Sequence, residues 1–178
     1  MSSDKQSNWT TFVALSTAAM AVLAAITTLY VGKYSSRTVL SQMQESDQWA
    51  FYQAKSIKSH SYELQKELVE LEFLGQKGRL PKDMAEKFRK TAENYGQKIL
   101  RYDSEKKEIK AKAEELDRQK QLSQAHGANF GYALIFLQIA IMLSSIAAIT
   151  KKKPLWYFGL LTASAGGFFF FDGLYLFF

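Results

Sequence analysis

The residue with the clearest potential for chemistry is Asp172, because it is the one carboxylate in an otherwise apolar carboxyl-terminal region. It follows four consecutive phenylalanines and lies six residues before the end of the sequence. An ionisable side chain inside a membrane-crossing segment is a candidate cation or proton site. The alternative is that this carboxylate reaches the headgroup region, since six helical residues cover only about 9 Å. The sequence favours the interfacial alternative.

Other residues that could carry chemistry do not form a catalytic or metal-binding pattern. His60 and His126 lie far apart in the charged middle of the chain, and each is interpreted as a helix-surface residue. Gly75 and Gly78 mark a turn with no strand before it, which is unlike a phosphate-binding loop. The chain has no cysteine, so it has no disulfide framework. We expect a protein that is not an enzyme and that needs no cofactor or metal.

Several uncharged polar residues interrupt the apolar segments. Gln138 falls near the middle of one segment, where its amide needs an interhelical hydrogen bond worth about 0.5–2 kcal/mol. Thr17 and Thr28 belong to a stripe of small residues that could either pack against another helix or line a pore. Packing is favoured, because small residues let helix backbones approach closely in lipid. The stripe consists of Thr10, Ala14, Thr17, Ala21, Ala24 and Thr28.

Three apolar segments must position these residues. Trp9–Val31 contains no charge and, at about 1.5 Å per residue, is long enough to cross a bilayer core of roughly 30 Å. A cleaved signal peptide is the alternative, but the apolar run continues past the small residues that resemble a cleavage site. The predicted layout is a polar tail at 1–8, transmembrane helices at 9–34, 129–150 and 155–178, and a basic turn at 151–154. In the last helix, Gly159, Ala163 and Gly167 form the expected small-residue face.

Residues 35–125 carry most of the charge and predict a long helical hairpin with its turn at 75–81. The second arm has apolar or seam residues at alternating steps of three and four, which is typical of a left-handed coiled coil. The first arm has a looser apolar stripe at seven-residue spacing, and both arms are expected to continue into the neighbouring apolar segments as single rods. The second-arm stripe is Ala85, Phe88, Ala92, Tyr95, Ile99, Tyr102, Lys106, Ile109, Ala113, Leu116, Lys120 and Ser123. The first-arm stripe is Met43, Ala50, Ile57, Leu64 and Leu71, accompanied by Leu40, Asp47, Ala54, Ser61 and Leu68.

An unusually aromatic stretch in the first arm indicates a surface for subunit packing or for a protein partner. The string Asp47-Gln48-Trp49-Ala50-Phe51-Tyr52-Gln53-Ala54-Lys55-Ser56-Ile57-Lys58 resembles the signature of domain of unknown function family 4337. This resemblance implies a multi-pass protein of the bacterial inner membrane, and it brings no activity, cofactor or catalytic residue with it. The candidate contact residues are Trp49, Phe51, Tyr52, Ile57, Tyr95, Ile99 and Tyr102.

Charge narrows the class of partner and gives a first indication of orientation. The net charge is +6, but both signs are mixed along the hairpin, which argues against nucleic-acid binding. The positive-inside rule is nearly balanced, and the short Lys151–Lys153 turn favours a cytoplasmic side for itself. The hairpin is then extracytoplasmic.

Together these patterns predict an all-α membrane protein with three transmembrane helices and a long antiparallel coiled-coil hairpin between the first and second. The expected function is structural, as a homo-oligomeric scaffold in the lipid bilayer. The alternative function is an oligomeric ion channel or small transporter with the threonines or Asp172 in its pathway.

Overall fold

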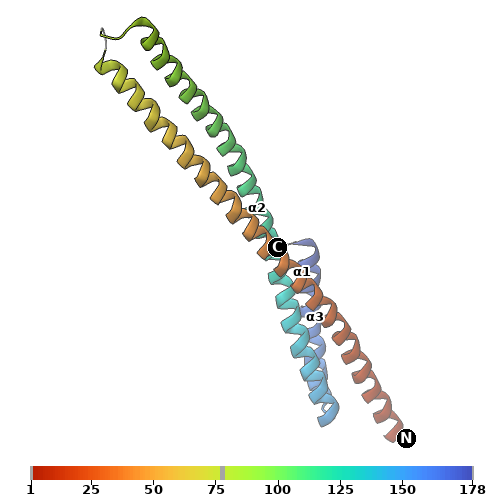
Figure 1. Cartoon of the computed structure of the whole chain (residues 1–178). Helices are drawn as coiled ribbons and strands as arrows, with labels where there is room; N and C mark the ends of the chain where they lie inside the picture. The colour runs from red at the N-terminus through yellow and green to blue at the C-terminus, as the bar shows by residue number, and fades with distance from the viewer. Residues whose placement is uncertain (1, 77–78, 178) are drawn as a thin grey trace. The chain divides into compact units, whose positions relative to one another are not determined.

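Three helices account for nearly all of the chain in the computed structural model, which describes residues 2–76 and 79–177 and side chains from Trp9 onward (Figure 1). Helix α1 is Ser2–Gly75, α2 is Lys82–Thr150 and α3 is Lys153–Tyr175. The only two prolines lie outside the helix interiors, where proline would break the hydrogen-bond ladder. Pro81 immediately precedes α2, and Pro154 stands in the first turn of α3.

Helices α1 and α2 each run without a break from an apolar segment into the charged middle of the chain. The expectation of two continuous rods is therefore confirmed, and α1 also includes the polar residues from Ser2 that precede Trp9. Gly32 does not interrupt α1, and Gly127 and Gly131 do not interrupt α2. α1 ends at Gly75, and the Pro81 carbonyl accepts the Met84 and Ala85 N–H groups at the start of α2.

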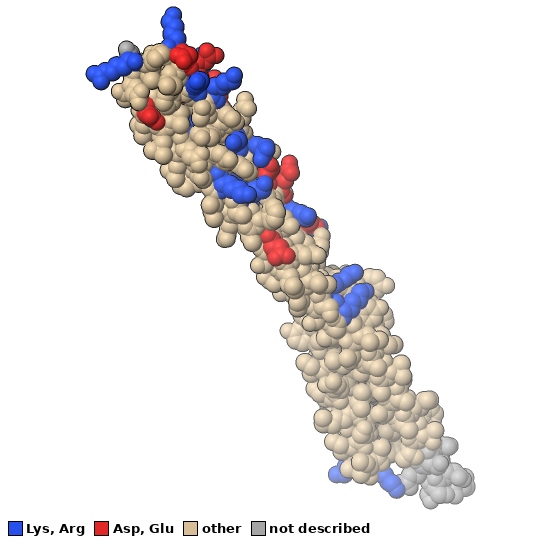
Figure 2. All heavy atoms as spheres, in the orientation of Figure 1, with Lys and Arg blue, Asp and Glu red and all other residues tan. Residues whose placement is uncertain are grey.

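The contacts divide the chain into two units. The apolar unit comprises residues 1–40 and 119–178, and the hairpin unit comprises residues 41–118. On the face drawn in Figure 2, side chains of both charges are interspersed over the hairpin unit, whereas the apolar unit shows charge only near its ends. This is the distribution expected when one unit is solvated by water and the other by an apolar medium.

In the hairpin unit, α1 and α2 pack together in antiparallel directions. Phe73 lies against Phe88 with 6.2 Å between ring centroids, and Tyr62 packs between Tyr95 and Tyr102 at 5.6 and 5.9 Å. Residue numbers therefore rise along α1 as they fall along α2. The predicted inner stripe of α2 is confirmed, because every one of its residues is buried or half-buried.

The inner stripe of α1 differs from the predicted one. The leucine-rich series at seven-residue spacing is exposed, with Ile57 at 71% and Leu71 at 58%. A more polar series packs against α2 instead, because it supplies partners for the rings and charges of α2: Tyr62 for the tyrosines and Lys55 for Glu105. The observed inner stripe also advances by three and four residues: Ser41, Glu45, Gln48, Tyr52, Lys55, Ser59, Tyr62, Lys66, Val69 and Phe73.

In the apolar unit, glycines of α3 allow α2 to approach closely. A Cβ added at Gly166 would lie 3.0 Å from Leu137 Cγ and 3.2 Å from the Ala133 carbonyl oxygen, while one added at Gly167 would meet nothing within 4 Å. The predicted face of Gly159, Ala163 and Gly167 is therefore wrong beyond Gly159, because Gly166 and not Gly167 lies against α2. The observed line is Gly159, Gly166 and Gly173.

The packing face of α1 in the apolar unit also differs from the small-residue stripe. Val13, Met20, Ala24 and Thr27 are buried, and of the predicted stripe only Ala24 is. Three of these four buried side chains are larger than alanine, so this face of α1 packs through van der Waals contact of larger side chains and not through a stripe of small ones.

The glycine line gives a direct test of the α2–α3 register. Gly166→Val should destabilise the protein by about 1–3 kcal/mol, because the added methyl groups overlap Leu137 and the Ala133 carbonyl. The measurement is thermal unfolding of the full chain in mild detergent, followed by circular dichroism. Gly167→Val is the matched control, since the same substitution one residue later enters open space. Equal losses in the two variants would contradict the observed register.

Candidate functional site

Asp172 lies in the last turns of α3, where it is only 4% exposed. Asn129 Nδ2 donates to one carboxylate oxygen at 2.6 Å, and the Phe177 N–H donates to the other at 2.8 Å. The Asp172 carbonyl also accepts the Leu176 N–H at 2.7 Å. The carboxylate is thus buried within the chain and hydrogen-bonded to α2, while the choice between an interfacial and a pathway role for it stays a prediction.

His126 joins the same region from α2. Its Nδ1 lies 2.7 Å from the Gly173 carbonyl oxygen, so Nδ1–H is the donor, and its ring stacks on Tyr34 at 4.6 Å. The prediction of a solvated helix residue is therefore wrong for His126. It holds for His60, which is exposed and whose Nδ1 lies 3.2 Å from Glu63. We refer to His126, Asn129, Asp172 and the Gly173 carbonyl as the polar clasp.

Aromatic rings surround the polar clasp. Phe130 follows Asn129 on α2 and is fully buried, stacked on Tyr30 at 4.8 Å and edge-on to Phe170 at 5.6 Å. Gly173 leaves room for this ring, since an added Cβ would lie 3.1 Å from it. The clasp can fix the end of α3 on α2, and its buried carboxylate can hold a proton or contribute to the binding of a cation.

The remaining polar candidates of the apolar unit differ in their partners. Thr17 and Thr28 donate to carbonyls of their own helix, at 2.8 and 2.9 Å. Gln138 is exposed, and within the described residues its amide has no hydrogen-bond partner. Trp156 Nε1 donates to Ser16 Oγ at 3.1 Å. This hydrogen bond depends on how α3 packs against α1, which residue spacing alone does not predict.

The aromatic contact candidates of the hairpin unit divide into an inner and an outer group. The inner group is buried or half-buried between α1 and α2, and Trp49, also half-buried, lies 5.7 Å from the Tyr52 ring. The outer group is Phe51 and Ile57, exposed at 61% and 71%. Only the outer group is fully available to another molecule. The inner group consists of Tyr52, Tyr95, Ile99 and Tyr102.

One ion pair joins α1 to α2 along the polar seam, and a second lies within α2 beside it. Lys55 Nζ donates to Glu105 at 2.5 Å, and this bond lowers the pKa of the Glu105 carboxyl. Lys106 donates to Asp103 at 2.7 Å, which lowers the pKa of the Asp103 carboxyl and raises that of Lys106. Ser59 Oγ adds a longer bond of 3.4 Å to Asp103. The polar inner stripe of α1 thus matches the charges of α2.

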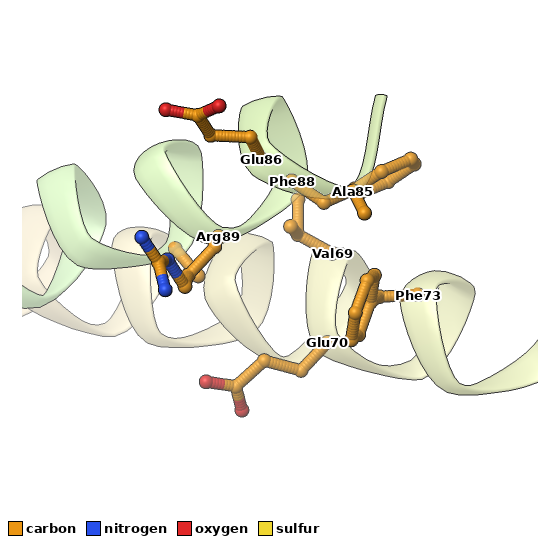
Figure 3. A pocket seen from close by; sticks show the side chains of 8 residues that line it. Val69, Glu70, Phe73, Ala85, Glu86, Phe88 and Arg89 are labelled. Carbon is orange, nitrogen blue, oxygen red and sulfur yellow. The ribbon is translucent and has the colours of Figure 1, made fainter. Parts of the chain in front are cut away.

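A groove of about 510 Å³ lies between α1 and α2 near the turn of the hairpin (Figure 3). Phe73, Phe88 and Val69 give it apolar walls, while Glu86 and Arg89 carry charge on its lining. The signal for this groove in the sequence is the pair of small side chains Ala85 and Ala92 in the α2 stripe, which leave space between the helices.

Within the part of the chain that the structure describes, no three His, Asp or Glu side chains are grouped to hold a metal ion. The fold defines an all-α protein in which two long helices pack together. All three helices are long and apolar enough to cross a membrane.

Comparison with known sequences then gives the family. Residues 9–176 match the family described as Domain of unknown function (DUF4337), and the chain belongs to that family. The resemblance seen in the Asp47–Lys58 string is confirmed. No curated protein and no solved structure matches the chain.

The ion pair at Asp103 makes the hairpin sensitive to acid. Its carboxyl pKa is lowered in the folded chain, so its stabilising contribution is complete above the unfolded pKa of about 3.9 and is lost as the pH falls through the folded value. Between pH 5 and pH 3 the unfolding temperature should therefore fall less in Asp103→Asn than in the parent chain. Circular dichroism in detergent measures both, and Glu67→Gln removes an exposed α1 carboxylate as the control. Identical acid profiles for Asp103→Asn and the parent would contradict this role.

Proposed function

We propose that this protein is a non-catalytic integral membrane protein that self-assembles through its hairpin and acts as a structural scaffold. Three helices with the length and composition of membrane spans support an integral location. A hairpin unit with one face unused by the chain supports assembly. No activity is needed to explain the arrangement of the described residues.

The observation that carries this proposal is the exposed apolar stripe of α1, defined as Met43, Ala50, Ile57, Leu64, Leu68 and Leu71. Met43, Leu64 and Leu68 are exposed at 60%, 49% and 65%. A seven-residue repeat faces a partner continuously only when that partner is another helix supercoiled with it. α2 already occupies the opposite side of α1, so the second partner comes from outside the hairpin. From Met43 to Leu71 the stripe extends for about 42 Å.

A second copy of the chain is the partner that fits this stripe best. Copies inserted in one membrane with the same orientation carry α1 in the same direction and at the same height, so identical stripes meet in register. Such a parallel pair is a coiled coil, in which Ile57, Leu64 and Leu71 pack against their equivalents. Asp47 and Ser61 interrupt the neighbouring row and lower its affinity. Phe51 lies beside the stripe and widens the contact.

The proposed location is the bacterial inner membrane, crossed three times. The Lys151–Lys153 turn is short and strongly basic, which supports a cytoplasmic position under the positive-inside rule. The hairpin then stands on the extracytoplasmic side. The positions of the turn and of the hairpin depend on the proposed membrane location. The proposed self-assembly does not depend on them.

The assembly is tested by placing charge on the stripe. Ile57→Glu combined with Leu64→Glu should raise the dissociation constant at least tenfold, because burying each of these side chains is worth about 1.5–3 kcal/mol. The measurement is the mass of the full chain in mild detergent, by light scattering or native mass spectrometry. The variants should keep the parent helicity, since both positions are already exposed in the single chain.

Leu100→Glu is the matched control, because Leu100 is 70% exposed on α2 and lies outside the stripe. It should leave the oligomer unchanged. A parent chain that is monomeric at all concentrations would overturn the proposal.

A second candidate function is an ion channel or small transporter, and the buried carboxylate of the polar clasp is the observation in its favour. Purified protein in planar bilayers should then conduct, and Asp172→Asn should change the current at least tenfold. Bilayers that stay silent across salts and voltages would rule against this candidate and leave the scaffold proposal intact.

A further inference from the structure

We propose that Gln138 pairs with Gln138 of a second copy of this chain inside the bilayer. This inference rests on the proposed membrane location and self-assembly, and it assigns a contact that is separate from the α1 stripe. The pair is formed by two α2 helices that meet along the line Gly131, Gln138 and Ser145.

The line faces away from the rest of the apolar unit. Phe130, Leu137 and Ser144 each precede one of its residues and are fully buried. Gln138 and Ser145 are exposed, and a Cβ added at Gly131 would meet nothing within 4 Å. Spacing by seven keeps the line on one side of a helix that supercoils with a partner.

The depth of Gln138 requires that its amide be paired. Eight residues separate it from Phe130 and twelve from Thr150, which places it about 12 Å from one end of the apolar run and about 18 Å from the other. These distances put the amide well inside a hydrocarbon core of roughly 30 Å, beyond the reach of headgroups and water. An amide in that position finds a partner on another helix. The described residues of its own chain offer none.

A second copy provides that partner at the right depth. In copies inserted with the same orientation, the two Gln138 side chains lie at the same height. A primary amide is both donor and acceptor, so two of them form reciprocal hydrogen bonds. Gly131 and Ser145 flank the pair with small side chains, which lets the helix backbones approach. The Ser145 hydroxyl already donates to the Ile141 carbonyl at 2.8 Å, so it does not compete for the amide.

Because the chain contains no cysteine, single cysteines report this contact without interference. Ser145→Cys, with Gln138 intact, should form a disulfide-linked dimer when native membranes containing the full chain are oxidised. Ile139→Cys and Leu161→Cys are the controls, since both positions are exposed in apolar helices but lie off the line. The control dimers should form at least tenfold more slowly.

The role of the amide is tested in the Ser145→Cys background. Gln138→Leu should slow cross-linking at least tenfold, while Gln138→Asn, which keeps an amide, should retain most of it. A Gln138→Leu variant that cross-links as fast as the parent would overturn the pair. A cross-linked product with a mass other than twice that of the chain would overturn the choice of a second copy.

These outcomes separate this inference from the scaffold proposal. If Ser145→Cys fails to cross-link while the α1 stripe variants still dissociate an oligomer, the Gln138 pair is wrong and self-assembly stands. If the parent chain is a monomer in membranes and in detergent, both are wrong.

Discussion

The structure depends on one constraint, the nearly continuous inner line of α2. Residues of this line recur at steps of three and four from Ala85 to Ala147 and are buried or half-buried throughout. The alternation changes once, where two steps of three follow each other at Lys120, Ser123 and His126. One helix therefore keeps a packing face through two chemically different parts of the chain.

The same geometry is stabilised by different physics in each unit. In the hairpin unit the inner line carries Tyr102, which stacks on Tyr62 of α1, and beside the line Glu105 pairs with Lys55 of α1. Ring stacking and an ion pair therefore hold the two helices together in this unit. In the apolar unit, for which a membrane location is proposed, close backbone approach takes the place of hydrophobic burial as the source of association. Gly159, Gly166 and Gly173 on α3 supply that approach. The polar clasp at the end of the line adds directional bonds where α3 ends.

The sequence predicted elements well and partners poorly, for a physical reason. Periodicity indicates that one face of a helix is covered. The second-arm stripe could be predicted because the face of α2 that packs against α1 is also the most apolar face of that helix. On α1 the two criteria disagree: the most apolar series is exposed, and the series that contacts α2 contains Lys55 and Ser59. Hydrophobicity alone predicts the wrong face of α1, because it does not depend on which charges and rings lie on α2.

Register was the other quantity that the sequence could not supply. The choice between Gly166 and Gly167 depends on a rotation of one residue, and both belong to plausible small-residue patterns. Asp172 was found as a candidate from its type and position alone. Its partners Asn129 and Phe177 depend on the packing of α3 on α2 and on the turn of the backbone where α3 ends at Tyr175.

Two exposed features of the chain have no packing or hydrogen-bonding partner among the described residues. On α1, a helical repeat lies opposite the face that α2 covers, and a repeat of that period has little use on a surface bathed only in water. On α2, the exposed Gln138 amide would lie, in the proposed membrane location, at a depth where lipid offers it no hydrogen bond. A partner of the α1 stripe must present apolar side chains with the same seven-residue spacing. A partner of Gln138 must present one polar group at the same depth. In the proposed assembly a second copy of the chain in the same membrane supplies both neighbours, so one kind of partner explains these residues more simply than two unrelated ones.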